Sequence, residues 1–365
     1  MVEAIPLIEI AGPPRERGRE YGRKAAARIQ LGVRHYTEQL GRSAFDTEAI
    51  RALVRGYVPQ MERFDASYVE EMRGIADGAG IDFADVALLN ARTEILKLGQ
   101  RPDLRAKLAG CDACTGVVAL PSATRDGRVI HAQNWDWKAE CAETAVVLKI
   151  HRDDGPDILT FTEAGGLARS GFNAAGIAIT ANYLESDRDY SQLGVPLALI
   201  RRKVLELPHL ALAMRAVYVT PKSAANNMIV SHAGGVAIDV ECAPDETFQV
   251  HPESGLLVHA NHFVSPVALA KLRDTGIANT PDSLYRDVRV RTLLAPEIGR
   301  LTRQTVKQAL LDDFETPWSV CRPPRKGVND TVTATVATIV MEPALGIMEV
   351  APLPALGPEF TTYRL

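Results

Sequence analysis

The first third of the chain has the hydrophobic periodicity of helices. Between residues 15 and 40, apolar residues recur at helical spacing and the charged residues gather on the opposite face, which predicts one long amphipathic helix. Residues 79–98 predict a second helix, and Asp82 stands where an N-cap residue is expected. The helical pattern as a whole extends from about residue 13 to residue 100.

From Cys114 onward the pattern changes to short runs rich in β-branched residues, separated by turn residues such as Asp126 and Gly127. These runs predict strands, and two longer stretches, 195–207 and 283–299, predict helices between them. Helices followed by two clusters of antiparallel strands favour an α+β layered architecture over alternating βαβ units. The runs predicted as strands are 115–121, 128–135, 144–151, 158–166, 176–183, 226–232, 234–242, 255–263, 331–343 and 346–352.

Composition and charge exclude several classes of protein. The 365 residues are 46% hydrophobic and 24% charged, which is typical of globular proteins, and a formal charge of −4 offers no basic surface for nucleic acid. The chain has no run of 18 apolar residues, so no membrane span is expected. The first ten residues include Glu3 and Glu9 and do not resemble a signal peptide. We therefore expect a cytoplasmic protein whose five cysteines are mostly thiols.

Cys111 and Cys114 form a C-x-x-C motif with three interpretations. A zinc site would need further Cys or His residues at ligand spacing, and the sequence has none there. A redox pair is expected at a helix N-terminus, whereas here a strand follows. The third interpretation is a pair of inert thiols in a loop. His259 and His262 lie at a strand end, so hydrogen-bonded structural roles are expected rather than metal binding, and no cofactor is predicted.

Cys114 also has the chemistry to act alone if the peptide bond before it is cut. Its α-amine would then have an ordinary pKa of about 7.7–8.0 and could serve as general base for its own thiol near neutral pH. A strand that begins at this residue and enters the core would hold the nucleophile in a fixed position. Such an arrangement needs no histidine partner.

Several runs, taken in their order and spacing, point to one family. The nucleophile region is Cys114-Thr115 at the start of a strand, followed by a hairpin that leads to QNWDW at residues 133–137. The other runs are PRERGREYG near the start, LLNARTE at 88–94, GGLARSGFNAAGIAITANYL at 165–184, HANHF at 259–263, DSLYRDVRVRTLL at 282–294, and the final strands TVATIVMEP and MEVAP. Over nearly its whole length the chain resembles the acyl-coenzyme A:6-aminopenicillanic-acid acyltransferases, also called isopenicillin-N acyltransferases, which are N-terminal-nucleophile hydrolases.

This resemblance implies a four-layer αββα sandwich and a precursor that cleaves itself before the nucleophilic cysteine. The cut before Cys114 would give a mainly helical α chain, residues 1–113, and a β chain, residues 114–365, which together form one structural unit.

Carrying over the family's motifs assigns roles to four residues. Cys114 is the nucleophile, and Asp136 is the acidic partner that orients the site. Asn261 is the oxyanion-hole side chain, because an amide N–H stabilises negative charge on the attacked carbonyl oxygen. Arg286 is the matching basic residue, which could hold Asp136 or bind a substrate carboxylate.

Three further residues are substrate-binding candidates. Ser283 is a weaker member of the set that includes Arg286, and Asn134 belongs to the QNWD run. Arg92 either reaches the cleavage region or forms a salt bridge with a neighbouring carboxylate such as Glu94.

Two departures from the family pattern leave alternatives open. Ala113 precedes Cys114 where members often have glycine, which eases strained backbone. Cys111 does follow a glycine, Gly110, so a cut before Cys111 is the competing assignment. We favour Cys114 because Cys-Thr leads directly into the strand. Gln133 stands where some related amidases carry arginine, so a basic residue must come from elsewhere.

The predicted function is hydrolysis of the C–N bond of an N-acyl compound through a thioester on Cys114. The closest alternative is an acyltransferase that moves the acyl group from acyl-CoA or an acyl amide to an amine, since amine and water compete for the same thioester. A thiol-redox or non-catalytic binding protein using Cys111 and Cys114 is the alternative from another class. The expected partners are a small-molecule amide or acyl-CoA substrate and the chain's own α fragment, and a homo-oligomer is left open.

Overall fold

The computed structural model describes residues 3–42, 47–98, 113–326 and 331–365. Cys114 is therefore described, whereas Cys111 lies outside the described residues, together with the redox interpretation and the alternative cut that depend on it. Within the described ranges, no helix combines the length and the apolar character that crossing a membrane requires.

The N-terminal part of the chain is helical, as predicted, but it begins with a strand that the hydrophobic pattern did not reveal. The predicted helix 15–40 lies within α1, and the predicted helix 79–98 corresponds to α4, which starts directly after Asp82. The elements of this part are β1 (Leu7–Ile10), α1 (Pro14–Arg42), α2 (Thr47–Phe64), α3 (Ala66–Ala79) and α4 (Phe83–Leu98).

The strands form two sheets, and every run predicted as a strand overlaps one of them. The order is β1-β4-β5-β6-β7-β8-β9-β10 in the first sheet and β11-β2-β3-β13-β14-β15 in the second, where β12 also pairs with β13. The strands that follow β1 are β2 (Ala113–Ala119), β3 (Ile130–Lys138), β4 (Ala145–Ile150), β5 (Ile158–Glu163), β6 (Ser170–Asn173), β7 (Ile177–Tyr183), β8 (Asn226–His232), β9 (Val236–Cys242), β10 (Thr247–Val250), β11 (Leu256–His259), β12 (Arg325–Lys326), β13 (Val332–Glu342), β14 (Ile347–Pro352) and β15 (Thr361–Arg364).

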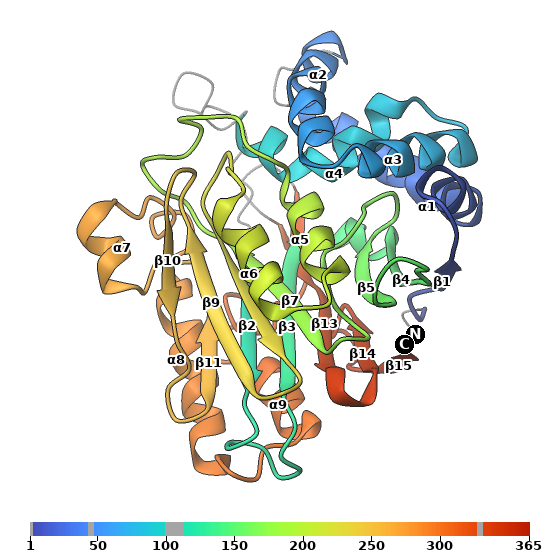
Figure 1. Ribbon diagram of the computed structural model, residues 1–365. Helices are drawn as coiled ribbons and strands as arrows, with labels where there is room; N and C mark the ends of the chain where they lie inside the picture. Colours follow the sequence, from blue (N-terminus) through green and yellow to red (C-terminus); the bar gives the residue numbers. More distant parts are fainter. Residues whose placement is uncertain (1–2, 43–46, 99–112, 327–330) are drawn as a thin grey trace.

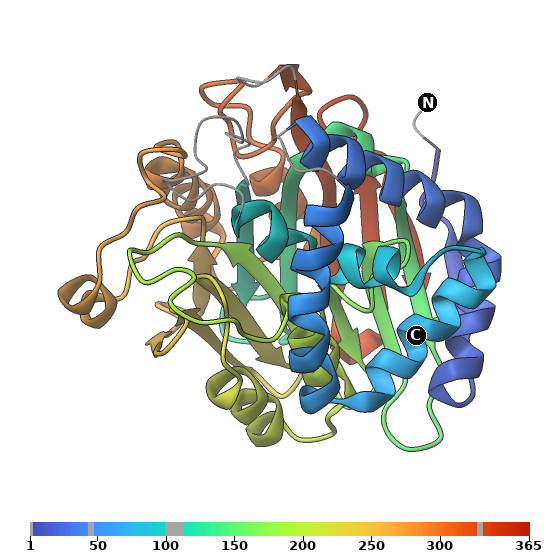
Figure 2. The same ribbon diagram turned by 90° about the horizontal axis from the view of Figure 1, so that it is seen from above.

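Helices cover the outer faces of the two sheets, which pack against each other. Figure 1 shows α5 and α6 in front of the first sheet, with the second sheet behind it, and α8 and α9 contact strands of the second sheet. Figure 2 shows α1–α4 gathered along one flank. This arrangement confirms the α+β layered sandwich predicted from the sequence. The later helices are α5 (Leu197–Glu206), α6 (Leu210–Val219), α7 (Pro266–Lys271), α8 (Ser283–Leu294) and α9 (Arg303–Leu310).

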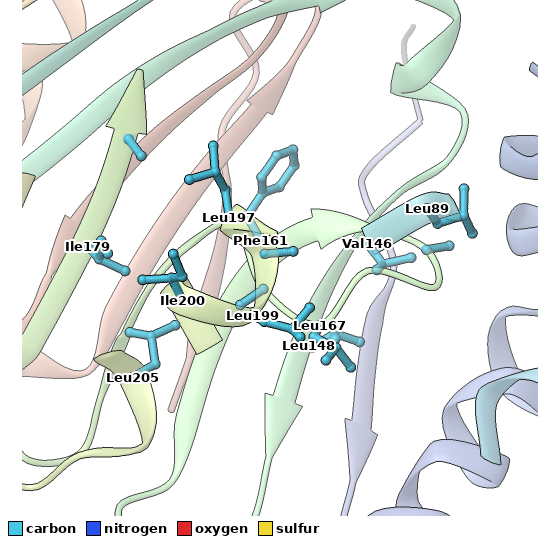
Figure 3. Packing of buried hydrophobic residues seen from close by; sticks show 14 of the residues in the cluster. Leu89, Val146, Leu148, Phe161, Leu167, Ile179, Leu197, Leu199, Ile200 and Leu205 are labelled. Atoms are coloured by element: carbon cyan, nitrogen blue, oxygen red, sulfur yellow. The ribbon is translucent and has the colours of Figure 1, made fainter. Parts of the chain in front are cut away.

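Helix α5 is fixed to the first sheet by aliphatic packing. Its buried face meets the outward side chains of the sheet and of α4, as Figure 3 shows. Burial of each large aliphatic or aromatic side chain stabilises the fold by about 1.5–3 kcal/mol. The labelled members of this cluster are Leu89, Val146, Leu148, Phe161, Leu167, Ile179, Leu197, Leu199, Ile200 and Leu205.

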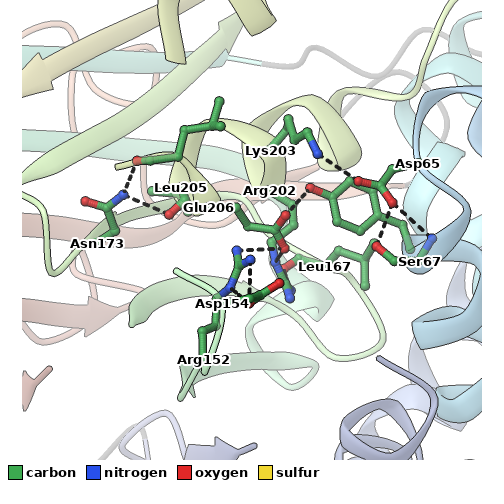
Figure 4. A network of polar contacts seen from close by, with 12 residues as sticks. Asp65, Ser67, Arg152, Asp154, Leu167, Asn173, Arg202, Lys203, Leu205 and Glu206 are labelled. Atoms are coloured by element: carbon green, nitrogen blue, oxygen red, sulfur yellow. Dashed lines mark hydrogen bonds and ion pairs between the residues drawn. The ribbon is translucent and has the colours of Figure 1, made fainter. Parts of the chain in front are cut away.

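Buried ion pairs connect the N-terminal helices to α5. Glu71 of α3 is 1% exposed and receives hydrogen bonds from Arg17 of α1 at 2.7 Å and from Arg202 of α5 at 3.0 Å. Figure 4 shows Arg202 amid a wider polar network in which Lys203 of α5 also pairs with Asp65. A buried carboxylate between two guanidinium groups fixes the relative positions of the three helices.

Candidate active site

Strands β2 and β3 hold Cys114 between the two sheets. Cys114 is opposite Trp135 in the antiparallel register, so both side chains leave the sheet on the same face. The next pair on this face is Gly116 and Gln133, and the Gln133 amide donates to the Ala181 carbonyl of β7 in the other sheet. Every residue of β2 is buried, and Cys114 is 3% exposed. The thiol therefore sits at a fixed position in the core.

Asn261 holds the backbone of Cys114. The Cys114 N–H donates to Asn261 Oδ1 at 2.7 Å, and Arg286 Nη2 donates to the same oxygen at 2.8 Å. Because both neighbours are donors, the side-chain oxygen must face them, and this assigns the amide orientation. Asn261 Nδ2 in turn donates to the Tyr183 carbonyl at 2.8 Å. Asn261, which the resemblance assigns to the oxyanion hole, thus lies beside Cys114.

Arg286 is completely buried and supports this arrangement from α8. Its Nη1 donates to the Cys114 carbonyl at 2.6 Å and to the Thr115 hydroxyl at 2.8 Å, and its Nε donates to Asp282 at 2.8 Å. The sequence predicts that Arg286 holds Asp136 or binds a substrate carboxylate. Its recorded hydrogen bonds instead go to the backbone and side chains around Cys114.

Asp136 borders the site, but its side chain leaves β3 on the face opposite to the thiol. Its register partner is Ala113, one residue before Cys114. Thr335 donates to Asp136 Oδ1 at 2.6 Å, and Arg322 Nε lies 3.4 Å from Oδ2. Burial raises the pKa of Asp136 above its ordinary value, while the charges of Arg322 and Arg286 oppose that shift. Arg322 is thus the basic residue that pairs with Asp136.

Two of the predicted substrate-binding residues act as internal supports. Ser283 and Asn134 are both 0% exposed, and neither lines the pocket that the described residues form beside Cys114. Ser283 Oγ accepts the Asn261 N–H at 2.7 Å, which positions the loop after β11. Asn134 Nδ2 donates to the Leu310 carbonyl at 2.7 Å, so it ties β3 to α9. In these positions both side chains hold together the elements that surround the pocket, and their direct contact with a substrate stays a prediction.

The two histidines of HANHF have hydrogen-bonded structural positions, as expected. His259 Nε2 lies 2.8 Å from Glu241 Oε1, and His262 Nδ1 lies 2.8 Å from Ser283 Oγ. Burial lowers the pKa of His259, but the carboxylates of Asp239 and Glu241 outweigh burial and raise it to about 9. The charged imidazole anchors the strand end that leads to Asn261.

A small pocket opens beside Cys114. Arg92 lines it and pairs with Glu163 rather than with Glu94. Arg92 Nε also donates to the Tyr36 hydroxyl at 2.8 Å. The apolar part of the wall comes from Trp137, Ala181 and Leu197.

Sequence reasoning missed two arginines in this pocket. Arg169, in the turn between β5 and β6, has its Nη2 4.0 Å from Cys114 Sγ and its guanidinium 4.2 Å from the centre of the Trp135 ring. Arg201 reaches the pocket from α5. The signal for these two residues in the sequence was only indirect. Because Gln133 stands where some related amidases carry arginine, another residue had to supply the positive charge, but no motif indicated which one.

The chain has recognisable relatives. The family model described as acyl-coenzyme A:6-aminopenicillanic acid acyl-transferase matches residues 122–351. The acyl-coenzyme A:6-aminopenicillanic-acid-acyltransferase 40 kDa form of Emericella nidulans is 28% identical over 325 residues, which are 88% of this chain and 85% of that protein. Penicillin V acylase from Agrobacterium tumefaciens has 16% identity and a TM-score of 0.46, covering 69% of this chain and 86% of that one. The N-acylethanolamine-hydrolyzing acid amidase ortholog of Caenorhabditis elegans has the same identity and TM-score, covering 69% of this chain and 100% of that one.

Proposed function

The chain belongs to the acyl-coenzyme A:6-aminopenicillanic acid acyl-transferase family, and from this premise we propose that it is a self-cleaving amide hydrolase with Cys114 as its N-terminal nucleophile. The family predicted from the sequence is thereby confirmed. Acyl transfer is the activity named for the family and for the Emericella relative, so the chain is an enzyme acting on acyl compounds. The cysteine nucleophile, the cut and the hydrolytic outcome are our proposal.

The observation that carries the proposal is the fixed backbone of Cys114 next to a pocket. Asn261 accepts the Cys114 N–H at 2.7 Å, and Arg286 donates to the Cys114 carbonyl at 2.6 Å. The nitrogen held by Asn261 is the peptide nitrogen of the bond to be cut, and it becomes the α-amine afterwards. A general base on the nucleophile's own residue needs this kind of fixed orientation.

Self-cleavage proceeds as an N-to-S acyl shift followed by hydrolysis. Cys114 Sγ attacks the carbonyl carbon of Ala113, the C–N bond breaks, and the nitrogen takes up the proton that the thiol has lost. Water then attacks the thioester, which leaves a carboxylate on Ala113 and a free thiol and amine on Cys114. Asp136 is opposite Ala113 in the register, so it lies close to the bond that breaks.

Turnover repeats the same chemistry on a substrate. The α-amine accepts the thiol proton, the thiolate attacks the substrate carbonyl, and Asn261 Nδ2 donates to the developing oxyanion. The leaving amine takes the proton, and water hydrolyses the thioester to a carboxylic acid. Arg169, at 4.0 Å from Sγ, favours the thiolate through its charge.

Acyl transfer to an amine is the second candidate, and the 28% identity with an Emericella acyltransferase favours it. Both reactions share the thioester and differ only in the nucleophile that resolves it. Measuring free acid and new amide from one substrate, with increasing concentrations of an added amine, separates them. Products that consist of new amide alone would replace hydrolysis with transfer.

The test of the nucleophile is mass spectrometry of purified protein. We expect wild type to give two fragments, with the second starting at Cys114. Cys114→Ala should stay full length and inactive, whereas Cys111→Ala should still be cut. An uncut Cys111→Ala protein beside a cut Cys114→Ala protein would move the nucleophile to Cys111. An intact wild-type chain whose Cys111–Cys114 pair cycles with thiols would favour the redox alternative.

A further inference from the structure

Among the residues that the structure describes, one arginine in the pocket beside Cys114 has no counter-ion. Arg201 is 7% exposed and lines the pocket from α5. Among the described residues it has no hydrogen-bond or ion-pair partner, and its Nε is fully buried without an acceptor. Buried charges in proteins are normally paired, because desolvation of an unpaired guanidinium is costly. An unpaired arginine at a pocket wall is therefore the expected mark of a site for an anion.

A second arginine in the same pocket repeats this feature. Arg169 stacks on Trp135 and points its Nη2 toward Cys114 Sγ, but no described carboxylate pairs with it and its Nε has no acceptor. Arg92 differs, because Glu163 and Tyr36 satisfy its guanidinium. Within the described part of the chain, the pocket thus has one arginine that a carboxylate neutralises and two that none does.

The acidic residues near the pocket compensate the charge of Arg201 only in part. Glu94 Oε1 accepts the Leu197 N–H at 2.8 Å, and burial raises the pKa of the Glu94 carboxyl, which disfavours its charged form. Asp136 pairs with Arg322 on the far face of β3. Burial, together with the charges of Arg169 and Arg92, outweighs the charge of Glu94 and lowers the pKa of Arg201 to about 9. A bound anion would relieve this repulsion.

We propose that Arg201 and Arg169 form a carboxylate-binding subsite, and that the substrate is a short N-acyl compound with a carboxylate a few atoms from the scissile carbonyl. The identification of the substrate rests on the proposed amide hydrolysis, whereas the subsite itself does not. The compound is short because Arg169 Nη2 is only 4.0 Å from Cys114 Sγ, so the carboxylate and the attacked carbonyl must lie within a few atoms of each other. Trp137, Ala181 and Leu197 would contact its methylene groups.

Two alkylating reagents of nearly equal size test the subsite without knowledge of the substrate. Iodoacetate carries the carboxylate and iodoacetamide is neutral, and the rate of modification of the Cys114 peptide is followed by mass spectrometry. The ratio of the two rates is divided by the same ratio for glutathione, which removes their intrinsic difference. We expect the normalised ratio to be about 10- to 100-fold above one, as a charge-assisted hydrogen bond implies.

Variants identify the arginine responsible. Arg201→Gln should bring the normalised ratio close to one, and Arg201→Lys should retain part of it. The matched control is Arg215→Gln, which alters an exposed arginine of the neighbouring α6 and should behave as wild type. If Arg201→Gln does not fold, protection of the wild type decides: glutarate should slow alkylation by iodoacetamide, and glutaramide should not.

The outcomes separate the subsite from the proposed function. A normalised ratio of one in wild type, or the same ratio in Arg201→Gln as in wild type, overturns the subsite. The subsite is also overturned if Cys114 reacts faster than glutathione by the same factor with both reagents, because the arginines would then act only by favouring the thiolate. Hydrolysis of amides such as glutaryl anilide is measured separately. If Cys114 prefers iodoacetate but no amide is cleaved, the carboxylate subsite is supported and the proposed amide hydrolysis is refuted.

Discussion

Two substitutions at Asn261 separate its two contacts with the nucleophile. Asn261→Asp keeps a side-chain oxygen for the Cys114 N–H and for Arg286, but it loses the Nδ2 donor that now contacts the Tyr183 carbonyl. Asn261→Ala loses the acceptor and the donor together. The pair therefore distinguishes a group that stabilises the oxyanion from a group that only positions Cys114.

The expected magnitudes follow from these contacts. Loss of one oxyanion donor costs about 2.7–4 kcal/mol of barrier, so kcat should fall about 100- to 1,000-fold in both variants. Asn261→Ala also leaves the charged donor of Arg286 without its acceptor in a completely buried position. That loss should lower the free energy of unfolding by about 1.5–3 kcal/mol, because hydrogen bonds to charged groups are worth this much. Asn261→Asp should keep most of the stability.

Three measurements on each variant test this reasoning. Gel electrophoresis gives the extent of self-cleavage, steady-state kinetics on one amide gives kcat, and urea unfolding gives the stability. Gln249→Glu is the control for the change from amide to carboxylate, because Gln249 is exposed on β10 and should tolerate it at near wild-type rates. A wild-type kcat in cleaved Asn261→Asp would remove Asn261 from the oxyanion hole and leave it a positioning role only.

Three further substitutions test the framework around the site. Glu71→Gln should lower the free energy of unfolding by about 3–5 kcal/mol, because it leaves Arg17 and Arg202 buried without their carboxylate, whereas Glu70→Gln at an exposed pair should leave urea unfolding almost unchanged. Phe161→Ala should cost about 3–5 kcal/mol in the same assay and slow turnover, since Phe161 packs edge-on against Trp135, and equal stability would refute that packing. The pKa of His259 is raised to about 9 from about 6.5, so its contribution to stability should be complete below pH 6.5 and lost as the pH rises toward 9. The difference in unfolding free energy between wild type and His259→Gln should shrink over that interval, and a constant difference would contradict it.

Most of the fold was predictable because, along most elements, the hydrophobic periodicity of the sequence agrees with the pattern of buried side chains in the structure. Strand β2, for example, reads as a β-branched run, and it is buried over its whole length. Strand β1 was missed because its four residues stand alone before α1, and only its partner β4, far along the chain, makes them a strand. Short edge elements such as β15 depend on tertiary pairing in the same way.

The site residues that belong to a family motif were predictable. Those that reach the site from elements distant in the sequence, outside any motif, were not. Asn261 and Arg286 meet at Cys114, as their motifs suggested. Arg201 enters the pocket from a helix whose spacing reads as amphipathic, so sequence alone gives it the appearance of a surface charge. Arg322 precedes a two-residue strand in a loop with no motif. Their approach to the site depends on packing between sheets, which a linear pattern does not contain.

The pairing of β1 with β4 has a consequence for the protein after the proposed cut. Strand β1 comes from the N-terminal segment and runs parallel to β4 at the edge of the first sheet. If the α fragment dissociated, it would take β1 with it and leave a row of unpaired N–H and C=O groups on β4. Such an exposed sheet edge promotes aggregation. The α and β fragments should therefore stay together as one complex at every protein concentration at which the protein remains folded. Each fragment expressed alone should be insoluble, whereas co-expression of the two fragments should give the soluble complex.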